Sequence, residues 1–176
     1  MTTIAFDGKI LATDSKQTIV SDRFAEVGLY CPHCNHSLDS MHLYTPKIEV
    51  PESEVQYGGS RVLAWAWAGN QRTTDAMRTS LLNDAPFDPK DRLNGTLVIL
   101  TESSLHEVRT YDGQYITTRI EKFPYAAGSG RQAAMIAMQH MGSSPCEAIT
   151  LASTVDVSTG GSAYFYSRTS NTIEKA

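Results

Sequence analysis

The beginning of the sequence carries the pattern that most constrains the fold of this chain. Two short β-like runs, Thr2–Phe6 and Lys9–Thr13, are separated only by Asp7-Gly8. Asp-Gly between such runs is a strong signal for a two-residue hairpin turn, because both residues tolerate positive φ angles. The sequence therefore predicts that these residues form two adjacent strands of a β-sheet.

The rest of the chain alternates between strand-like and helix-like patterns. Strands are expected at about 44–50, 61–68, 95–101, 105–110, 115–120 and 162–167. Helices are expected from the cap residue Asn70 to about Leu82, over Arg131–Met141, and from Ser144-Pro145 to about Ser153. The second helix is apolar almost all round, which is typical of a buried helix. This order of elements predicts an α+β fold in which helices cover sheets.

Composition indicates an ordinary globular protein. The 176 residues, 41% of them apolar, suffice for a single domain over residues 1–176. A chain of this length buries roughly 70% of the surface that it exposes when unfolded. The net charge is −4, and no cluster of Lys and Arg stands out, so we expect neither a nucleic-acid nor a membrane partner. No membrane span or signal peptide is recognisable, and three cysteines fit a reducing, cytoplasmic compartment.

Thr2 is the candidate nucleophile. Removal of Met1 would give Thr2 a free α-amine, and such amines have pKa values of about 7.7–8.0, so that much of the group can act as a base near neutral pH. The hydroxyl of the same residue would then be a nucleophile with its base already attached. Thr2 alone is a weak signal, because most proteins that begin with threonine do not use it in this way.

Blocks of sequence spread over nearly the whole chain strengthen this interpretation. They are, in chain order, Thr2–Lys9, Ala12–Ser15, Trp67–Gly69, Gly128–Gly130 and Asp156–Gly161. Together they resemble the proteasome β-type and HslV-like family of N-terminal nucleophile (Ntn) hydrolases. The resemblance implies a four-layer αββα sandwich, in which two antiparallel sheets are flanked by helices, and assembly into stacked rings.

The resemblance also implies roles for particular residues. Thr2 matches the nucleophile, Asp14 the carboxylate beside it, Lys47 the catalytic lysine, and Gly69 the donor of an oxyanion-hole N–H. A buried ammonium at Lys47 would lower the pKa of the Thr2 amine, and Asp14 would keep that ammonium charged. The set that holds the N-terminal amine corresponds to Ser129, Asp156 and Thr159.

Each of these assignments has a simpler alternative. Lys47 is also compatible with an ordinary lysine at a strand edge, and Lys9 and Lys16 are candidates of the same residue type. Asp14 is compatible with the start of a turn, and Ser129 with a helix cap. The residues Asp156 and Thr159 suit a turn before the following glycine pair.

The sequence departs from the family between Asp14 and Lys47, where we expect an insertion at about residues 21–42. Cys31 and Cys34 have the spacing of half a zinc ribbon, but four ligands from so short a loop would be cramped. A plain surface insertion is favoured over a structural zinc site or a redox-active cysteine pair, and no metal or other cofactor is expected. The histidines that raise the question are His33, His36 and His42.

The expected function is that of a threonine-type endopeptidase. It would cleave unfolded polypeptide inside a homo-oligomeric ring, fed by a separate ATP-dependent unfoldase, because nothing in the chain resembles a phosphate-binding loop. A catalytically silent ring or scaffold subunit of the same fold and a small-molecule amidase remain alternatives. A zinc-ribbon nucleic-acid module would depend only on Cys31 and Cys34, and the net charge argues against it.

Overall fold

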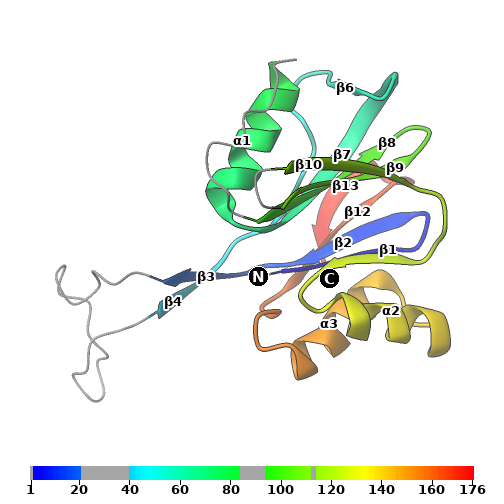
Figure 1. Ribbon diagram of the computed structural model, residues 1–176. Helices are drawn as coiled ribbons and strands as arrows, with labels where there is room; N and C mark the ends of the chain where they lie inside the picture. Colours follow the sequence, from blue (N-terminus) through cyan, green and yellow to red (C-terminus); the bar gives the residue numbers. More distant parts are fainter. Residues whose placement is uncertain (1, 21–39, 84–93, 112–113) are drawn as a thin grey trace, which may run out of the picture.

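The computed structural model describes residues 2–20, 40–83, 94–111 and 114–176, which form a mixed α+β structure (Figure 1). Its helices are α1 (Gln71–Leu82), α2 (Arg131–His140) and α3 (Pro145–Val155). The first antiparallel sheet has the order β11 (Tyr125–Gly128), β1 (Thr3–Phe6), β2 (Ile10–Asp14), β12 (Ala163–Ser167) and β13 (Thr172–Lys175). The second has the order β10 (Gln114–Ile120), β9 (Leu105–Tyr111), β8 (Gly95–Thr101), β7 (Ser60–Gly69) and β5 (Ile48–Glu49), with β6 (Gln56–Tyr57) also paired to β7. A separate pair consists of β3 (Lys16–Val20) and β4 (Ser40–Tyr44).

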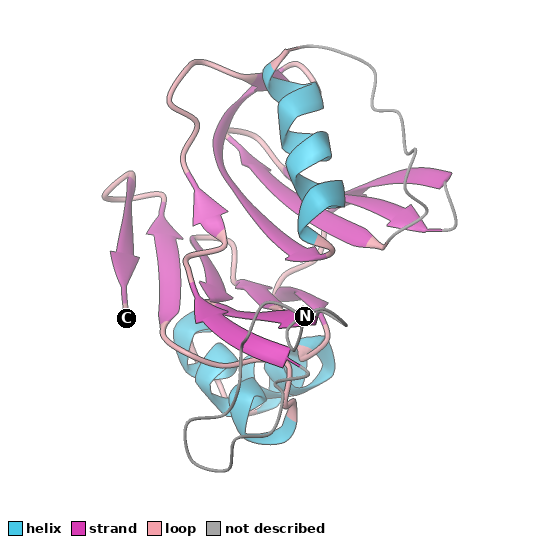
Figure 2. Ribbon diagram, turned by 90° about the vertical axis from the view of Figure 1, so that its left-hand side faces the viewer, coloured by secondary structure: helices cyan, strands magenta, loops and turns pink. Residues whose placement is uncertain are grey.

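Side-chain alternation along the strands builds the layers. In β1, Ile4 and Phe6 pack in an apolar cluster shared with the second sheet, whereas Ala5 packs with the residues of α2 and α3. In β7, Ala66 packs toward the first sheet and Trp65 toward α1. Successive strand residues point to opposite faces, so each sheet contributes to two apolar clusters. The layers therefore follow the order α2 and α3, first sheet, second sheet, α1 (Figures 1 and 2).

Several predicted elements are confirmed. The N-terminal hairpin is present as β1 and β2, with Ile4 opposite Thr13. α1 begins after Asn70, whose Oδ1 accepts the N–H of Thr73 at 3.2 Å. α3 begins with a capping box centred on Ser144. Each of these features depends on residues that lie close together in the sequence, which explains why local patterns predicted them.

Other predictions are wrong. β11 and β13 were not predicted, and the run at 44–50 is not one strand but belongs partly to β4 and partly to β5. β11 has the sequence Tyr-Ala-Ala-Gly, which has a low intrinsic preference for strands, and it is extended because it pairs with β1. The predicted insertion at 21–42 falls mostly on residues 21–39, which lie outside the described residues.

The prediction that the second helix is buried all round is also wrong. α2 buries Ala134, Ala137 and Met138 against the first sheet and α3, but Ile136 is 55% exposed. The helix lies in an outer layer, so only one of its faces contacts the sheet (Figure 2). None of the helices in the described ranges has the length and apolar character that crossing a membrane requires.

Candidate active site around Thr2

Thr2 lies just before β1 and is buried, with an exposed fraction of 2%. The carbonyl oxygen of Thr2 accepts the N–H of Ser129 at 3.0 Å, so the start of the first sheet is joined to the loop after β11. The hydroxyl oxygen Oγ1 of Thr2 accepts a hydrogen bond from Lys47 Nζ. The main chain and the side chain of Thr2 are therefore both held by distant parts of the sequence.

Lys47 directly precedes β5, at the edge of the second sheet, and its carbonyl accepts the N–H of Trp67 at 3.1 Å. The side chain is buried, and Nζ also donates to the carbonyl of Lys16, the first residue of β3. Lys47 Nζ lies 3.7 Å from Asp14 Oδ1. Among the lysines considered from the sequence, Lys47 is the one whose ammonium contacts Thr2, since Lys16 Nζ donates to the carbonyl of Val157 and Lys9 is exposed.

Asp14 ends β2 and has no exposed surface. Its carboxylate accepts the backbone N–H of Thr3 at 3.1 Å and that of Gly160 at 2.9 Å. Burial raises the pKa of Asp14, although the charge of Lys47 and these N–H groups act in the opposite direction. Burial likewise lowers the pKa of Lys47, against the attraction of Asp14. Burial therefore opposes the charged forms of both side chains, and their mutual attraction, together with the N–H groups that bind Asp14, offsets part of that cost.

A second hydrogen-bonded group lies beside Thr2. The carboxylate oxygen Asp156 Oδ2 accepts bonds from Ser129 Oγ at 2.5 Å and from Thr159 Oγ1 at 2.6 Å. Burial by itself would raise the pKa of Asp156, but these hydrogen bonds lower it, which keeps the carboxylate ionised. Ser129 belongs to the loop between β11 and α2, and the other two residues to the loop after α3, so the group joins two helix-flanking loops.

Thr3 connects the two groups. Its N–H donates to Asp14, while its hydroxyl accepts the N–H of Gly130 at 3.1 Å and lies 2.5 Å from Thr159 Oγ1. No role for Thr3 is predicted from the sequence. The only sequence feature that points to Thr3 is its place in a Thr-Thr pair at the start of the hairpin. Its neighbours in the sequence do not show that its hydroxyl contacts a loop residue 156 positions away.

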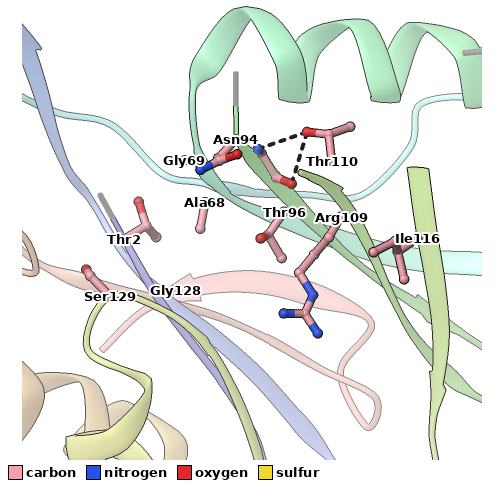
Figure 3. Close-up of a pocket in the computed structure, with 11 residues that line it drawn as sticks. Thr2, Ala68, Gly69, Asn94, Thr96, Arg109, Thr110, Ile116, Gly128 and Ser129 are labelled. Atoms are coloured by element: carbon pink, nitrogen blue, oxygen red, sulfur yellow. Dashed lines mark hydrogen bonds between the residues drawn. The ribbon is translucent and has the colours of Figure 1, made fainter. Parts of the chain in front are cut away.

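Gly69 ends β7 with a φ of +96°, a conformation that favours glycine. A Cβ at this position would clash with the carbonyl oxygen of Asn94, so the backbone of the next strand approaches closely here. Gly69 and Thr2 line the same cavity, which has a volume of about 470 Å³ (Figure 3). The opposite side of that cavity is lined by residues of β8, β9 and β10.

The structure thus brings all seven residues singled out from the sequence into one neighbourhood. A buried lysine contacts the Thr2 hydroxyl, a buried carboxylate accompanies the lysine, and a glycine backbone faces the same cavity. Such an arrangement suits attack by a hydroxyl oxygen on a carbonyl carbon. The seven residues are Thr2, Asp14, Lys47, Gly69, Ser129, Asp156 and Thr159.

The possible zinc ligands Cys31, His33, Cys34 and His36 lie outside the described residues. His42 lies in β4, but its side chain is not described. Within the part of the chain that the structure describes, no group of three or more His, Cys, Asp and Glu side chains is arranged to hold a metal ion.

Gly128→Ala is expected to lower the free energy of unfolding by about 3 kcal/mol or more, as measured by urea denaturation. Gly128 has a φ of +88°, and a methyl group there would overlap the carbonyl oxygen of Thr2. Gly142 is the matched control, because its φ is +68° but nothing lies within 4 Å of the added carbon. Gly142→Ala should cost about 1 kcal/mol. Equal losses in the two variants would contradict the close approach to Thr2.

Comparison of the chain with protein-family models finds no family that matches, and comparison with curated proteins finds no matching protein.

Proposed function

We propose that the protein is a threonine-type endopeptidase whose nucleophile is the hydroxyl of Thr2, exposed beside a free α-amine once Met1 has been removed. The observation that carries this proposal is the hydrogen bond from the buried Lys47 Nζ to Thr2 Oγ1, at the wall of a cavity large enough for a substrate side chain. Ligand pockets have volumes of about 300–1,000 Å³, and this cavity falls within that range at about 470 Å³.

In the first step, the Thr2 amine accepts the hydroxyl proton, directly or through a water, while Oγ1 attacks the carbonyl carbon of the peptide bond. The carbonyl oxygen becomes an oxyanion, which the N–H of Gly69 stabilises. The intermediate then collapses, the C–N bond breaks, and the proton passes to the departing amine. An ester between Thr2 and the acyl half of the substrate remains.

In the second step, water hydrolyses the ester. The Thr2 amine takes a proton from the water, the resulting hydroxide attacks the ester carbonyl, and the proton returns to Oγ1 as the acyl product leaves. Throughout both steps, charged Lys47 disfavours a second positive charge on the amine and so keeps it basic. Asp14 orients Lys47 through the 3.7 Å ion pair.

The second hydrogen-bonded group has a separate role in this mechanism. The Asp156 carboxylate, held by Ser129 and Thr159, lies next to the loop whose N–H binds the Thr2 carbonyl. We assign to this group the positioning of the Thr2 amine that appears when Met1 is removed. An ionised carboxylate with two hydroxyl partners can accept a hydrogen bond from that amine without a change in its own protonation.

The layer order supports assignment to the Ntn hydrolase fold, since that fold has two antiparallel sheets between helical layers. With the fold we propose the assembly that accompanies it: a homo-oligomeric ring in the cytoplasm that encloses the active sites, and a separate ATP-dependent unfoldase that supplies polypeptide. Enclosure has a physical purpose, because an exposed site of this kind would hydrolyse cellular proteins without selection.

A small-molecule amidase is the second candidate, because the volume of the cavity also suits a ligand smaller than a polypeptide. The same nucleophile would serve, since a peptide bond and any other secondary amide are attacked in the same way. Hydrolysis of peptides longer than the cavity can hold would favour the endopeptidase.

Labelling with a threonine-directed electrophile, such as a peptide epoxyketone or a β-lactone, tests the assignment of the nucleophile. Intact-mass analysis of the purified protein should show loss of Met1, and the adduct should map to Thr2 together with loss of peptide hydrolysis. Retention of Met1 would favour the catalytically silent ring subunit. An adduct on Ser129, the other hydroxyl at the cavity wall near Thr2, would contradict the proposal.

A further inference from the structure

One wall of the cavity beside Thr2 is a row of side chains that crosses four strands of the second sheet. Ala68 in β7 pairs with Thr96 in β8, Thr96 with Arg109 in β9, and Arg109 with Ile116 in β10. Directly paired residues of neighbouring strands project from the same face of a sheet. All four residues line the cavity that Thr2 lines from the other side (Figure 3).

Arg109 is the charged member of this wall, and no other described residue that lines the cavity carries a charge. Figure 3 shows its guanidinium extending away from the strand, into the space bordered by Thr96 and Ile116. The side chain is 46% exposed. The guanidinium is therefore accessible to a ligand in the cavity, and its backbone is fixed because β9 pairs with a strand on each side.

Glu107 anchors the guanidinium. Its Oε2 lies 3.1 Å from Arg109 Nη2, and the Glu107 side chain is only 9% exposed. Glu107 lies two residues before Arg109 on the same face of β9 and does not line the cavity. A guanidinium has five N–H donors in a planar fork, and this contact involves one of its nitrogens. The positive end of the pair therefore faces the cavity and the negative end faces the protein interior.

We propose that this wall binds a carboxylate of the substrate next to the scissile bond; this inference rests on the proposed function of Thr2. The planar fork of an arginine matches the two oxygens of a carboxylate. Ala68 and Ile116 provide apolar surface for the methylene groups of an acidic side chain, and the Thr96 hydroxyl provides a further donor. The carboxylate is either that of an internal Glu or Asp or the C-terminal carboxylate of a peptide.

The charge of the wall also disfavours other substrates. A lysine or arginine side chain in the cavity would lie against Arg109 and be repelled by it. An apolar side chain would displace water from the guanidinium without replacing the lost hydrogen bonds, and a glutamine would replace them with a single uncharged acceptor, so both bind less favourably than a carboxylate. The wall therefore separates substrates by charge, and a glutamate and a glutamine in the same position form the sharpest comparison because they have the same shape.

The test uses the processed full-length protein and fluorogenic peptides that differ only in Glu, Gln or Lys at the positions flanking the scissile bond. Wild type should cleave the Glu peptide with a kcat/KM about tenfold above that of the Gln peptide, with Lys lowest. Arg109→Gln should remove the difference between Glu and Gln. Arg119→Gln is the matched control: Arg119 is exposed on β10 and alternates to the opposite face from Ile116. This control should keep the preference.

Two further arms separate the possible origins of the effect. The reference is a Gln peptide with an amidated C-terminus. One test peptide carries an internal Glu and an amidated C-terminus, and the other carries Gln and a free C-terminal carboxylate. Faster cleavage of either test peptide than of the reference supports the proposal and identifies which carboxylate is bound. Glu107→Gln removes the competing carboxylate, so the preference for Glu should persist or increase. If Glu107→Gln and Arg109→Gln abolish the preference alike, the ion pair matters only for structure and the proposal is overturned.

Binding distinguishes failure of this inference from failure of the proposed function. In the Thr2→Ala protein, fluorescence anisotropy should show the labelled Glu peptide binding about tenfold more tightly than the Gln peptide, with the difference lost on adding Arg109→Gln. This result would support a carboxylate site even if the wild-type protein hydrolysed no peptide. Absence of hydrolysis would contradict only the proposed peptidase function. The carboxylate site would be overturned, and the role of Thr2 left untouched, if neither an internal Glu nor a free C-terminal carboxylate improved binding or wild-type kcat/KM over the amidated Gln peptide.

Discussion

Thr2→Ala should abolish peptide hydrolysis, with a fall in kcat/KM of at least about 10³-fold. The variant lacks the hydroxyl oxygen to which we assign the attack on the substrate carbonyl, and removal of the nucleophile of a serine protease costs about 10⁶-fold in kcat. A loss of 10³-fold corresponds to about 4 kcal/mol of transition-state stabilisation. The measurement is the hydrolysis of fluorogenic peptides by protein whose Met1 has been removed, as verified by intact mass.

Two variants serve as controls for the loss at Thr2. Thr2→Ser keeps the hydroxyl and should retain measurable hydrolysis as well as the covalent adduct. Ser143→Ala replaces another hydroxyl, in the segment between α2 and α3, and should leave kcat/KM within about twofold of wild type, as is usual for surface substitutions away from a site. Unchanged hydrolysis by Thr2→Ala would eliminate Thr2 as the nucleophile.

Lys47→Met should reduce kcat/KM by about 10³-fold or more while the chain stays folded. The substitution removes the hydrogen bond to Thr2 Oγ1 and the positive charge beside the Thr2 amine. Since a nearby cation disfavours protonation of that amine, its loss should also move the acidic limb of the residual pH–rate profile to higher pH. The measurement is kcat/KM across pH, together with far-UV circular dichroism.

The partner of Lys47 makes this variant tolerable for the fold. Asp14 keeps its hydrogen bonds from the N–H groups of Thr3 and Gly160, and its pKa is already raised by burial, so it can take up a proton when the lysine charge is removed. Lys9→Met is the matched control, because Lys9 is exposed beyond the hairpin turn. If both variants lose activity equally, or if Lys47→Met keeps full activity with an unchanged pH profile, Lys47 has no catalytic role.

The local elements of the fold could be predicted from the sequence because their signals are short in range. Asp7-Gly8 specifies a turn between two runs, and Asn70 and Ser144 each provide a side-chain acceptor for a helix start. β11 and β13 carry no comparable signal. β11 is a strand because its backbone pairs with β1 and places Gly128 opposite Thr3, which is information about the whole sheet.

The chemical groups that are available follow from the amino-acid sequence: an amine and hydroxyl at Thr2 once Met1 is removed, a lysine, carboxylates, and glycines that permit close backbone approach. Folding brings Lys47 rather than Lys9 or Lys16 into contact with Thr2, joins the two hydrogen-bonded groups through Thr3, and places Arg109 at the same cavity. The physical reason is that each of these contacts spans strands or loops far apart along the chain. Sheet register and the packing of two sheets, which no local pattern encodes, set the distances between them.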